Sequence, residues 1–272
     1  MNNLQLYHKL LGCLCQWLPG ERVTRQRNGA LLVIGLYLGS AIHLEDIVRE
    51  LPLLGQDLSL VNRMRRFLDN RHVDVWAWYR PLAEQLASQM AGQAIRLVID
   101  NTKVGFGYRV LMVGLLYHGR TLPLAWRVHR GSRGHVQAAK QVALLRRVAE
   151  LLPTGCSVTL LGDSEFGNVP LLNWLSYQDW QFIVRVKGSN KVSSDEQGWV
   201  KISQLALRVG ETNVIGWVRF THAHDAGWFW LVLHWAVGED APWYLLTDAP
   251  MSHRRLIKAY ERRMWIEEMF GD

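Results

Sequence analysis

Two short apolar runs, each followed closely by an aspartate, restrict the fold of this chain most strongly. Residues 95–99 are Ile, Arg, Leu, Val and Ile, and Asp100 follows them directly. Residues 157–161 are Ser, Val, Thr, Leu and Leu, and Asp163 comes two positions later. Apolar runs of this length are typical of strands that are buried in a sheet. The sequence therefore predicts a sheet in which two strands end at a carboxylate.

The elements around these runs predict a mixed α/β domain. A His-Gly-Arg turn separates two strand-like stretches, and Gly105-Phe106-Gly107 is interpreted as another turn. The expected order is strand, strand, strand, helix, strand, helix, strand, which fits a mixed sheet with a leading antiparallel meander. Beyond the two runs already described, the expected strands are 108–117, 121–128 and 182–186, and the expected helices are 135–152 and 169–177.

This order resembles the ribonuclease H-like arrangement, in which the first and fourth strands lie side by side. Their carboxyl-terminal ends would then bring Asp100 and Asp163 close together. Short alternating runs predict a β-rich insertion at about 190–247. A last helix is expected from Ser252, its N-cap, to Phe270.

Residues 1–92 are expected to form a helical N-terminal region, because their apolar residues recur at helical spacing. The whole chain carries 31 Lys and Arg against 24 Asp and Glu, a net charge of +7. Such a surplus suits a polyanionic partner. The basic residues of this region could be a solvated face, but their density favours contact with DNA phosphates. We therefore predict a DNA-binding region at 1–92 and a catalytic domain at 93–272.

The expected last helix carries a third acidic residue of interest. Tyr260, Arg263 and Glu267 are three and four positions apart, which places their side chains on one face of a helix. An exposed Arg–Glu ion pair would explain two of them without any function. Their position after two strand-end aspartates favours a site that the three acids share.

Three motifs resemble those of a known family. Residues 260–270 are similar to the Tyr-x2-Arg-x3-Glu-x6-Lys signature of bacterial DDE insertion-sequence transposases, most of all to the insertion-sequence-four-like group. Asp100-Asn101-Thr102 resembles the family's Asp-x-Thr, and residues 162–166 resemble its Gly-Asp-x-x-Phe. The resemblance extends from about residue 95 to residue 272.

The resemblance implies a metal-dependent enzyme that cleaves DNA at transposon ends and transfers the strands into target DNA. Asp100, Asp163 and Glu267 would hold two Mg²⁺ or Mn²⁺ ions, which carboxylate oxygens suit. Tyr260 and Arg263 would contact DNA phosphates near the cut. The implied partners are terminal inverted repeats and target DNA, bound by a homodimer. Basic loops near the same face add two further expected DNA contacts, Lys187 and Arg133.

Some features leave alternatives open. The signature's Lys would fall at position 274, beyond the last residue, so a C-terminal truncation is expected. A truncated, inactive DNA-binding fragment that acts as a regulator and a stand-alone ribonuclease H-like nuclease are the competing hypotheses. Glu165 is a rival to the three proposed ligands. Three cysteines without framework spacing, and apolar runs too short to span a bilayer, predict a protein of the bacterial cytoplasm, associated with the nucleoid and not with a membrane.

Overall fold

The computed structural model of the chain describes residues 2–52, 57–131, 136–194, 197–222 and 227–271. The chain divides into two compact units, residues 1–85 and 86–272. The division falls a few residues before the boundary that the sequence predicts. None of the helices in the described ranges is long and apolar enough to cross a membrane.

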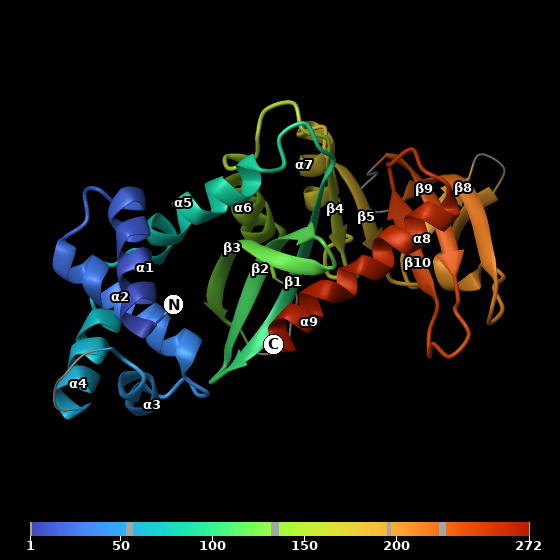
Figure 1. Cartoon of the computed structure of the whole chain (residues 1–272). Helices are drawn as coiled ribbons and strands as arrows, with labels where there is room; N and C mark the ends of the chain where they lie inside the picture. Colours follow the sequence, from blue (N-terminus) through green and yellow to red (C-terminus); the bar gives the residue numbers. More distant parts are fainter. Residues whose placement is uncertain (1, 53–56, 132–135, 195–196, 223–226, 272) are drawn as a thin grey trace. The chain divides into compact units, whose positions relative to one another are not determined.

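The first unit is helical, as predicted (Figure 1). Its first helix begins with a capping box, in which Asn2 Oδ1 accepts from Gln5 N–H at 2.9 Å and Gln5 Oε1 accepts from Asn2 N–H at 3.0 Å. Apolar residues at helical spacing, such as Leu31, Ile34 and Met64, form its core. The helices are α1 (Asn3–Trp17), α2 (Val23–Leu38), α3 (Leu44–Arg49), α4 (Asp57–Leu68) and α5 (Val75–Ser88).

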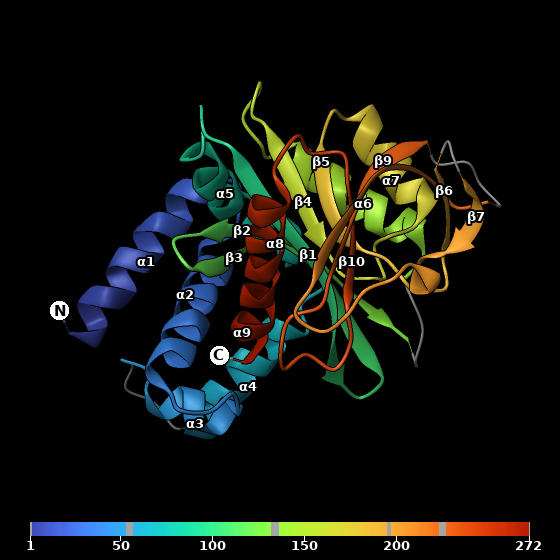
Figure 2. The same cartoon turned by 90° about the vertical axis from the view of Figure 1, so that its right-hand side faces the viewer.

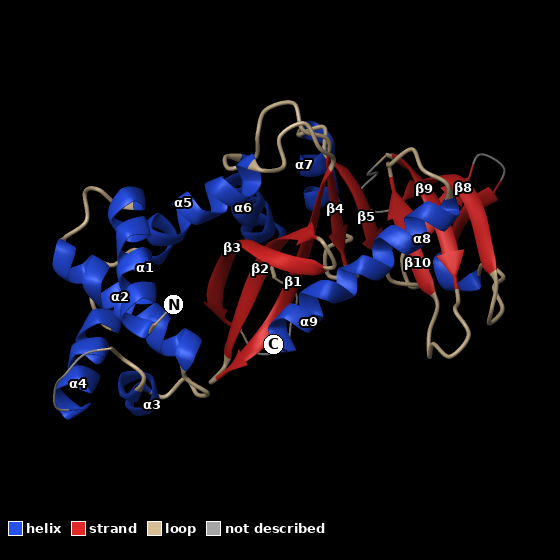
Figure 3. Ribbon diagram, in the orientation of Figure 1, coloured by secondary structure: helices blue, strands red, loops and turns tan. Residues whose placement is uncertain are grey.

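The second unit is built on one sheet with the strand order β3-β2-β1-β4-β5-β10-β9-β8-β6-β7 (Figure 3). Strands β1, β2 and β3 form an antiparallel meander, whereas β1, β4 and β5 are parallel neighbours. This is the order and direction of the expected ribonuclease H-like mixed sheet, so the predicted fold class is confirmed. These elements are β1 (Ile95–Gly105), β2 (Tyr108–Tyr117), β3 (Arg120–Arg130), α6 (Ala138–Ala149), β4 (Val158–Gly162), α7 (Val169–Tyr177) and β5 (Gln181–Arg185).

The segment before the last helix is rich in strands, as predicted, but its strands also extend the central sheet. Leu246 of β10 pairs with Val184 of β5 in antiparallel register, and β9 and β8 follow outward. This pairing covers the edge of β5, whose backbone groups would otherwise lack partners in the sheet. The added elements are β6 (Lys191–Ser194), β7 (Gln197–Lys201), η1 (Ile202–Gln204), β8 (Thr212–Phe220), β9 (Trp228–His234) and β10 (Trp243–Thr247).

The last helix begins after Ser252, as predicted, and a short 3₁₀ turn divides it into α8 (His253–Glu261), η2 (Arg262–Met264) and α9 (Trp265–Gly271). Leu256 and Ile266 of this helix pack on one face of the sheet in a fully buried cluster with Val98, Leu161 and Ile183. Helices α6 and α7 lie on the other side of the sheet (Figure 2). The carboxyl-terminal helix is therefore fixed against β1 and β4 by the core itself.

The glycine at position 29 of α2 generates a stability prediction for the first unit. An added methyl group there would overlap the ring of Trp78, whose Nε1 donates to Glu21 Oε2 at 3.1 Å. We expect Gly29→Ala to lower the free energy of unfolding by about 1–3 kcal/mol through overpacking. Urea unfolding followed by tryptophan fluorescence measures this.

The matched control is Gly12→Ala in α1, where an added Cβ has nothing within 4 Å. That substitution is expected to stabilise the protein slightly, because alanine has the higher helix propensity. Equal stability of the two variants would contradict the packing of Trp78 on Gly29.

Candidate active site

Asp100 and Asp163 stand next to each other where the parallel pairing of β1 and β4 ends, at the carboxyl-terminal side of these two strands. Ile99 pairs with Gly162 in the last parallel pair of β1 and β4, and Asp100 and Asp163 are the residues that follow. Strand β4 ends there, as predicted. The prediction that the first strand also ends at its aspartate is wrong, because the residues after Asp100 pair with β2 and continue β1 to Gly105. The juxtaposition expected from the sequence is therefore a direct result of the register between β1 and β4.

The residues after β4 form a tight turn that fixes Asp163. The Asp163 carboxylate accepts the N–H of Glu165 at 2.8 Å, and its carbonyl accepts the N–H of Phe166 at 3.0 Å. Phe166 is fully buried, and its Cβ lies 2.8 Å from where a side chain on Gly162 would begin. The Gly-Asp-x-x-Phe spacing is thus explained by packing, because only glycine leaves room for the phenylalanine.

Glu165, the rival ligand, is engaged with protein donors. Its Oε1 accepts the N–H of Val136 at 2.5 Å and the amide of Asn101 at 3.2 Å. Asn101 is buried, and its Oδ1 lies 3.2 Å from Nε2 of His129. These contacts join β1, β3 and the loop after β4. The sequence predicted neither the contact of Asn101 with Glu165 nor that with His129, because burial and the partners of a buried side chain are not visible in the sequence.

Arg263 and Glu267 form an ion pair on the last helix. Arg263 Nη2 lies 2.7 Å from Glu267 Oε1, and the side chains are 13% and 43% exposed. The guanidinium carbon also lies 5.8 Å from the ring centroid of Tyr260. Tyr260 itself is buried, and its ring centroid lies 5.2 Å from that of Trp243 in β10. The Tyr260 ring therefore packs against the Arg263 guanidinium inside the protein and does not face solvent.

The charges of Asp163, Glu267 and Arg263 influence the pKa of Asp100. The pKa of the Asp100 carboxyl is raised to about 6, chiefly by burial and to a smaller extent by the nearby negative charges of Asp163 and Glu267. The backbone N–H of Asn101 and the positive charge of Arg263 act in the opposite direction. Burial likewise raises the pKa of Tyr260 to about 12. The surroundings of Asp100 therefore disfavour its negatively charged form.

The three acids have the donor atoms that hard divalent cations prefer. Within the described ranges, no three His, Cys, Asp or Glu side chains are gathered closely enough to hold an ion. Arg263 instead supplies positive charge beside Glu267 and Asp100. The crowding of negative charge around Asp100 fits the chemistry of a site for a cation.

The remaining predicted DNA contacts lie near the turn after β4 or outside the described residues. Lys187 is exposed and shares a cleft of about 240 Å³ with Ser164, Glu165 and Asn190. Arg133 lies outside the described residues. The cleft places one expected basic residue next to the loop that carries Asp163.

Comparison with known proteins gives one family and a distant structural likeness. Residues 92–272 match the family described as "Transposase DDE domain". Among the solved structures, a cryo-EM structure of a piggyBac transposase synaptic complex with hairpin DNA is similar, with a TM-score of 0.49 and 12% sequence identity. The similarity covers 99% of this chain and 67% of that chain. No curated protein matches.

The buried Asp100 generates a prediction about pH. Its pKa of about 6 in the folded protein lies above the ordinary 3.8, so the folded state binds this proton more tightly than the unfolded state. Stability therefore falls as the pH rises from about 4 to about 6, and the cost is complete above that range. Each pKa unit corresponds to about 1.4 kcal/mol. We expect Asp100→Asn to stabilise the metal-free protein by about 3 kcal/mol at pH 7.5 and by about 1 kcal/mol at pH 4.5.

Urea unfolding at the two pH values measures both effects. Asp240→Asn, which changes an exposed carboxylate in the loop between β9 and β10, is the control and should change stability by less than about 0.5 kcal/mol. Equal stability of Asp100→Asn and the unaltered chain at pH 7.5 would contradict the electrostatic cost assigned to Asp100.

Proposed function

The chain belongs to the transposase DDE domain family, and from this premise we propose that it cuts DNA at the ends of a mobile element and joins the freed ends to target DNA. The observation that carries the proposal is the meeting of Asp100 and Asp163 where the parallel pairing of β1 and β4 ends, with Arg263 and Glu267 close enough to act on the charge of Asp100. We infer that Asp100, Asp163 and Glu267 are the acidic residues of the active site.

The three carboxylates would hold Mg²⁺ or Mn²⁺, as two ions. When bound, these ions would activate the attacking oxygen and stabilise charge on the departing one. The protein's own part is to hold the carboxylates on a rigid base. Parallel pairing fixes Asp100 and Asp163, and the packing of α8 and α9 on the sheet fixes the helix that carries Glu267.

Arg263 is proposed to contact a DNA phosphate beside the cut. Its planar guanidinium can bind two phosphate oxygens at once. The Tyr260 ring, held against Trp243, keeps the guanidinium at the site while its partner changes from Glu267 to phosphate. Tyr260 therefore has a positioning role in this proposal. Two DNA ends have to be joined, so we propose that two copies of the chain act together on DNA.

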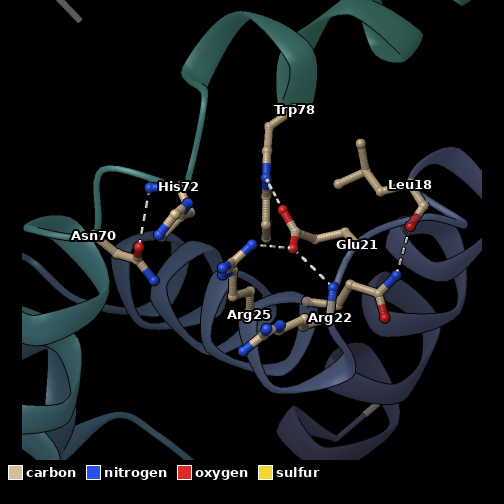
Figure 4. A network of polar contacts seen from close by, with 8 residues as sticks. Leu18, Glu21, Arg22, Arg25, Asn70, His72 and Trp78 are labelled. Carbon is tan, nitrogen blue, oxygen red and sulfur yellow. Dashed lines mark hydrogen bonds and ion pairs between the residues drawn. The ribbon is translucent and has the colours of Figure 1, made fainter.

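A basic cleft in the first unit supports DNA binding by the N-terminal region. The cleft has a volume of about 600 Å³, and none of the described residues that line it is acidic. Arg63 Nε donates to Asn28 Oδ1 at 2.7 Å. Arg25 pairs with Glu21 at 2.7 Å, beside Trp78 (Figure 4). The lining residues are Arg22, Thr24, Arg25, Asn28, Arg63, Arg66, Phe67, Asn70 and His72.

The chemistry of the cleft fits the phosphate backbone of DNA. Its arginines present several N–H donors, and neutralising phosphates releases condensed counterions. Such contacts position a protein on DNA without reading the base sequence. We therefore propose that the first unit holds DNA backbone while the second unit performs the chemistry.

The first prediction of this proposal concerns the three acids. Asp100→Asn, Asp163→Asn and Glu267→Gln are each expected to lower Mg²⁺- or Mn²⁺-dependent nicking by at least about a hundredfold, the effect of losing one charge-stabilising group. DNA affinity is expected to stay within about twofold, because phosphate contacts supply most of the affinity. The substrate is a supercoiled plasmid that carries the gene with its flanking DNA, and chelation by EDTA should stop the reaction.

Glu268→Gln, at the exposed neighbour of Glu267 in α9, is the matched control and should nick normally. Normal nicking by one of the three variants would remove that residue from the site. DNA binding without any nicking by the unaltered chain would contradict the proposed activity as a whole.

The second prediction concerns the basic cleft. Arg63→Ala and Arg66→Ala are each expected to weaken binding to any duplex and to reduce the slope of log K against log salt by about 0.9, the share of one phosphate contact. Fluorescence anisotropy of a labelled duplex at several salt concentrations measures both effects. Arg49→Ala, at an exposed arginine that is paired with Asp46 outside the cleft, is the control. An unchanged salt slope in both cleft variants would show that the cleft does not hold DNA.

A further inference from the structure

The turn between β1 and β2 displays an aromatic side chain in an unfavourable backbone conformation. Phe106 and Gly107 have φ angles of 49° and 75°, as in the two-residue hairpin turns that need two left-handed residues. Asn, Asp or Gly normally occupies the first of these positions. A bulky residue with positive φ is rare, because its Cβ crowds the backbone. The hairpin would therefore form more easily with another residue at position 106.

The Phe106 side chain does not stabilise the fold by packing. It is fully exposed, at 101% of its reference area. A single exposed apolar residue is common on protein surfaces. An exposed phenylalanine that also occupies a strained backbone conformation is uncommon. Backbone strain of this kind is found mainly at functional sites. The observation points to a ligand that Phe106 meets outside the protein.

Contacts from the end of β3 hold the backbone of the hairpin tip in place, so the position of Phe106 is well defined. Gly131 N–H donates to the carbonyl of Gly107 at 3.1 Å. Arg130 Nε donates to the hydroxyl of Tyr108 at 3.1 Å, and its guanidinium carbon lies 5.3 Å from the Tyr108 ring centroid. The end of β3 thus supports both sides of the turn.

The surroundings of the tip are basic. Residues 101–110 and 127–131, which form the parts of β1, β2 and β3 next to the tip, contain four Lys or Arg residues and no Asp or Glu. Lys103 and Arg130, near the tip, are both exposed. An apolar tip among positive charges is complementary to duplex DNA, whose base stack is apolar and whose backbone is anionic.

The position of the hairpin relates it to the acidic site. β1 runs on beyond Ile99, its last residue paired with β4, and carries the turn past the place where Asp100 and Asp163 stand. Phe106 is six residues beyond Asp100, which is at most about 20 Å along a strand. That distance is the length of about six stacked bases.

We propose that Phe106 is a wedge that inserts between neighbouring base pairs of the bound duplex, with Lys103 and Arg130 on the flanking phosphates. The inference rests on the proposed DNA transposase function and adds a site of DNA distortion to it. Insertion of an apolar side chain partly unstacks a base step and bends the duplex. A step that is already weakened by a mismatch costs less to open, so the wedge should favour it.

The experiment compares two labelled duplexes of about 30 base pairs, identical except for one central mismatch. The unaltered chain is expected to bind the mismatched duplex about five- to tenfold more tightly in an anisotropy titration, because the mismatch lowers the cost of unstacking. Phe106→Asn should abolish this preference and leave binding to the paired duplex within twofold. Phe106→Leu, which keeps an apolar wedge, should retain most of the preference.

Two further measurements separate the wedge from a fold defect. Phe106→Asn should melt at the same or a higher temperature than the unaltered chain, because Asn suits the left-handed turn. Tyr177→Ala removes another highly exposed aromatic, at the end of α7, and should leave the preference intact.

Several results would overturn the inference. The wedge is wrong if the unaltered chain shows no preference for the mismatch, or if Phe106→Asn keeps it. A variant that changes only the sedimentation behaviour would instead assign Phe106 to contact between copies of the chain. Failure of the unaltered chain to bind either duplex would contradict the DNA-binding function as well, which distinguishes that outcome from loss of the wedge alone.

Discussion

The parallel pairing of β1 with β4 is the interaction on which the rest of the site depends. It sets Ile99 opposite Gly162 and so places Asp100 beside Asp163. The register is maintained by packing, since a shift of one residue would exchange the side chains between the two faces of the sheet, which pack against different helices. The close packing of Phe166 on Gly162 then fixes the turn that carries Asp163.

Gathering acids where the pairing of β1 and β4 ends opposes the stability of the fold. Asp100 is buried among like charges, and its raised pKa records that cost. Arg263 offsets part of it, since it pairs with Glu267 and lies close enough to act on Asp100. The same arrangement suits an enzyme of this family, because a site that is poorly satisfied alone gains most from bound cations and phosphates. Phe106 is a second feature that costs stability, since it occupies a strained turn and its side chain buries no surface.

The strands of the segment before the last helix contribute to this site as well as to the sheet. β10 pairs with β5, and its Trp243 packs against Tyr260, over which Arg263 lies. The sequence predicted the strands from their alternation. It did not predict their union with the central sheet, because strand pairing between distant segments depends on edges that only the assembled fold exposes.

The sequence by itself determined the order of the elements, the two aspartates that follow buried apolar runs and the helical face shared by Tyr260, Arg263 and Glu267, because each depends on local periodicity and on short motifs. Only the tertiary structure decided that Tyr260 is buried, that Asn101 binds Glu165, and that Phe106 is fully exposed. Burial, hydrogen-bond partners and charge coupling depend on segments that are distant in the chain and adjacent in space. A local pattern cannot specify those neighbours, since they exist only once the sheet has assembled.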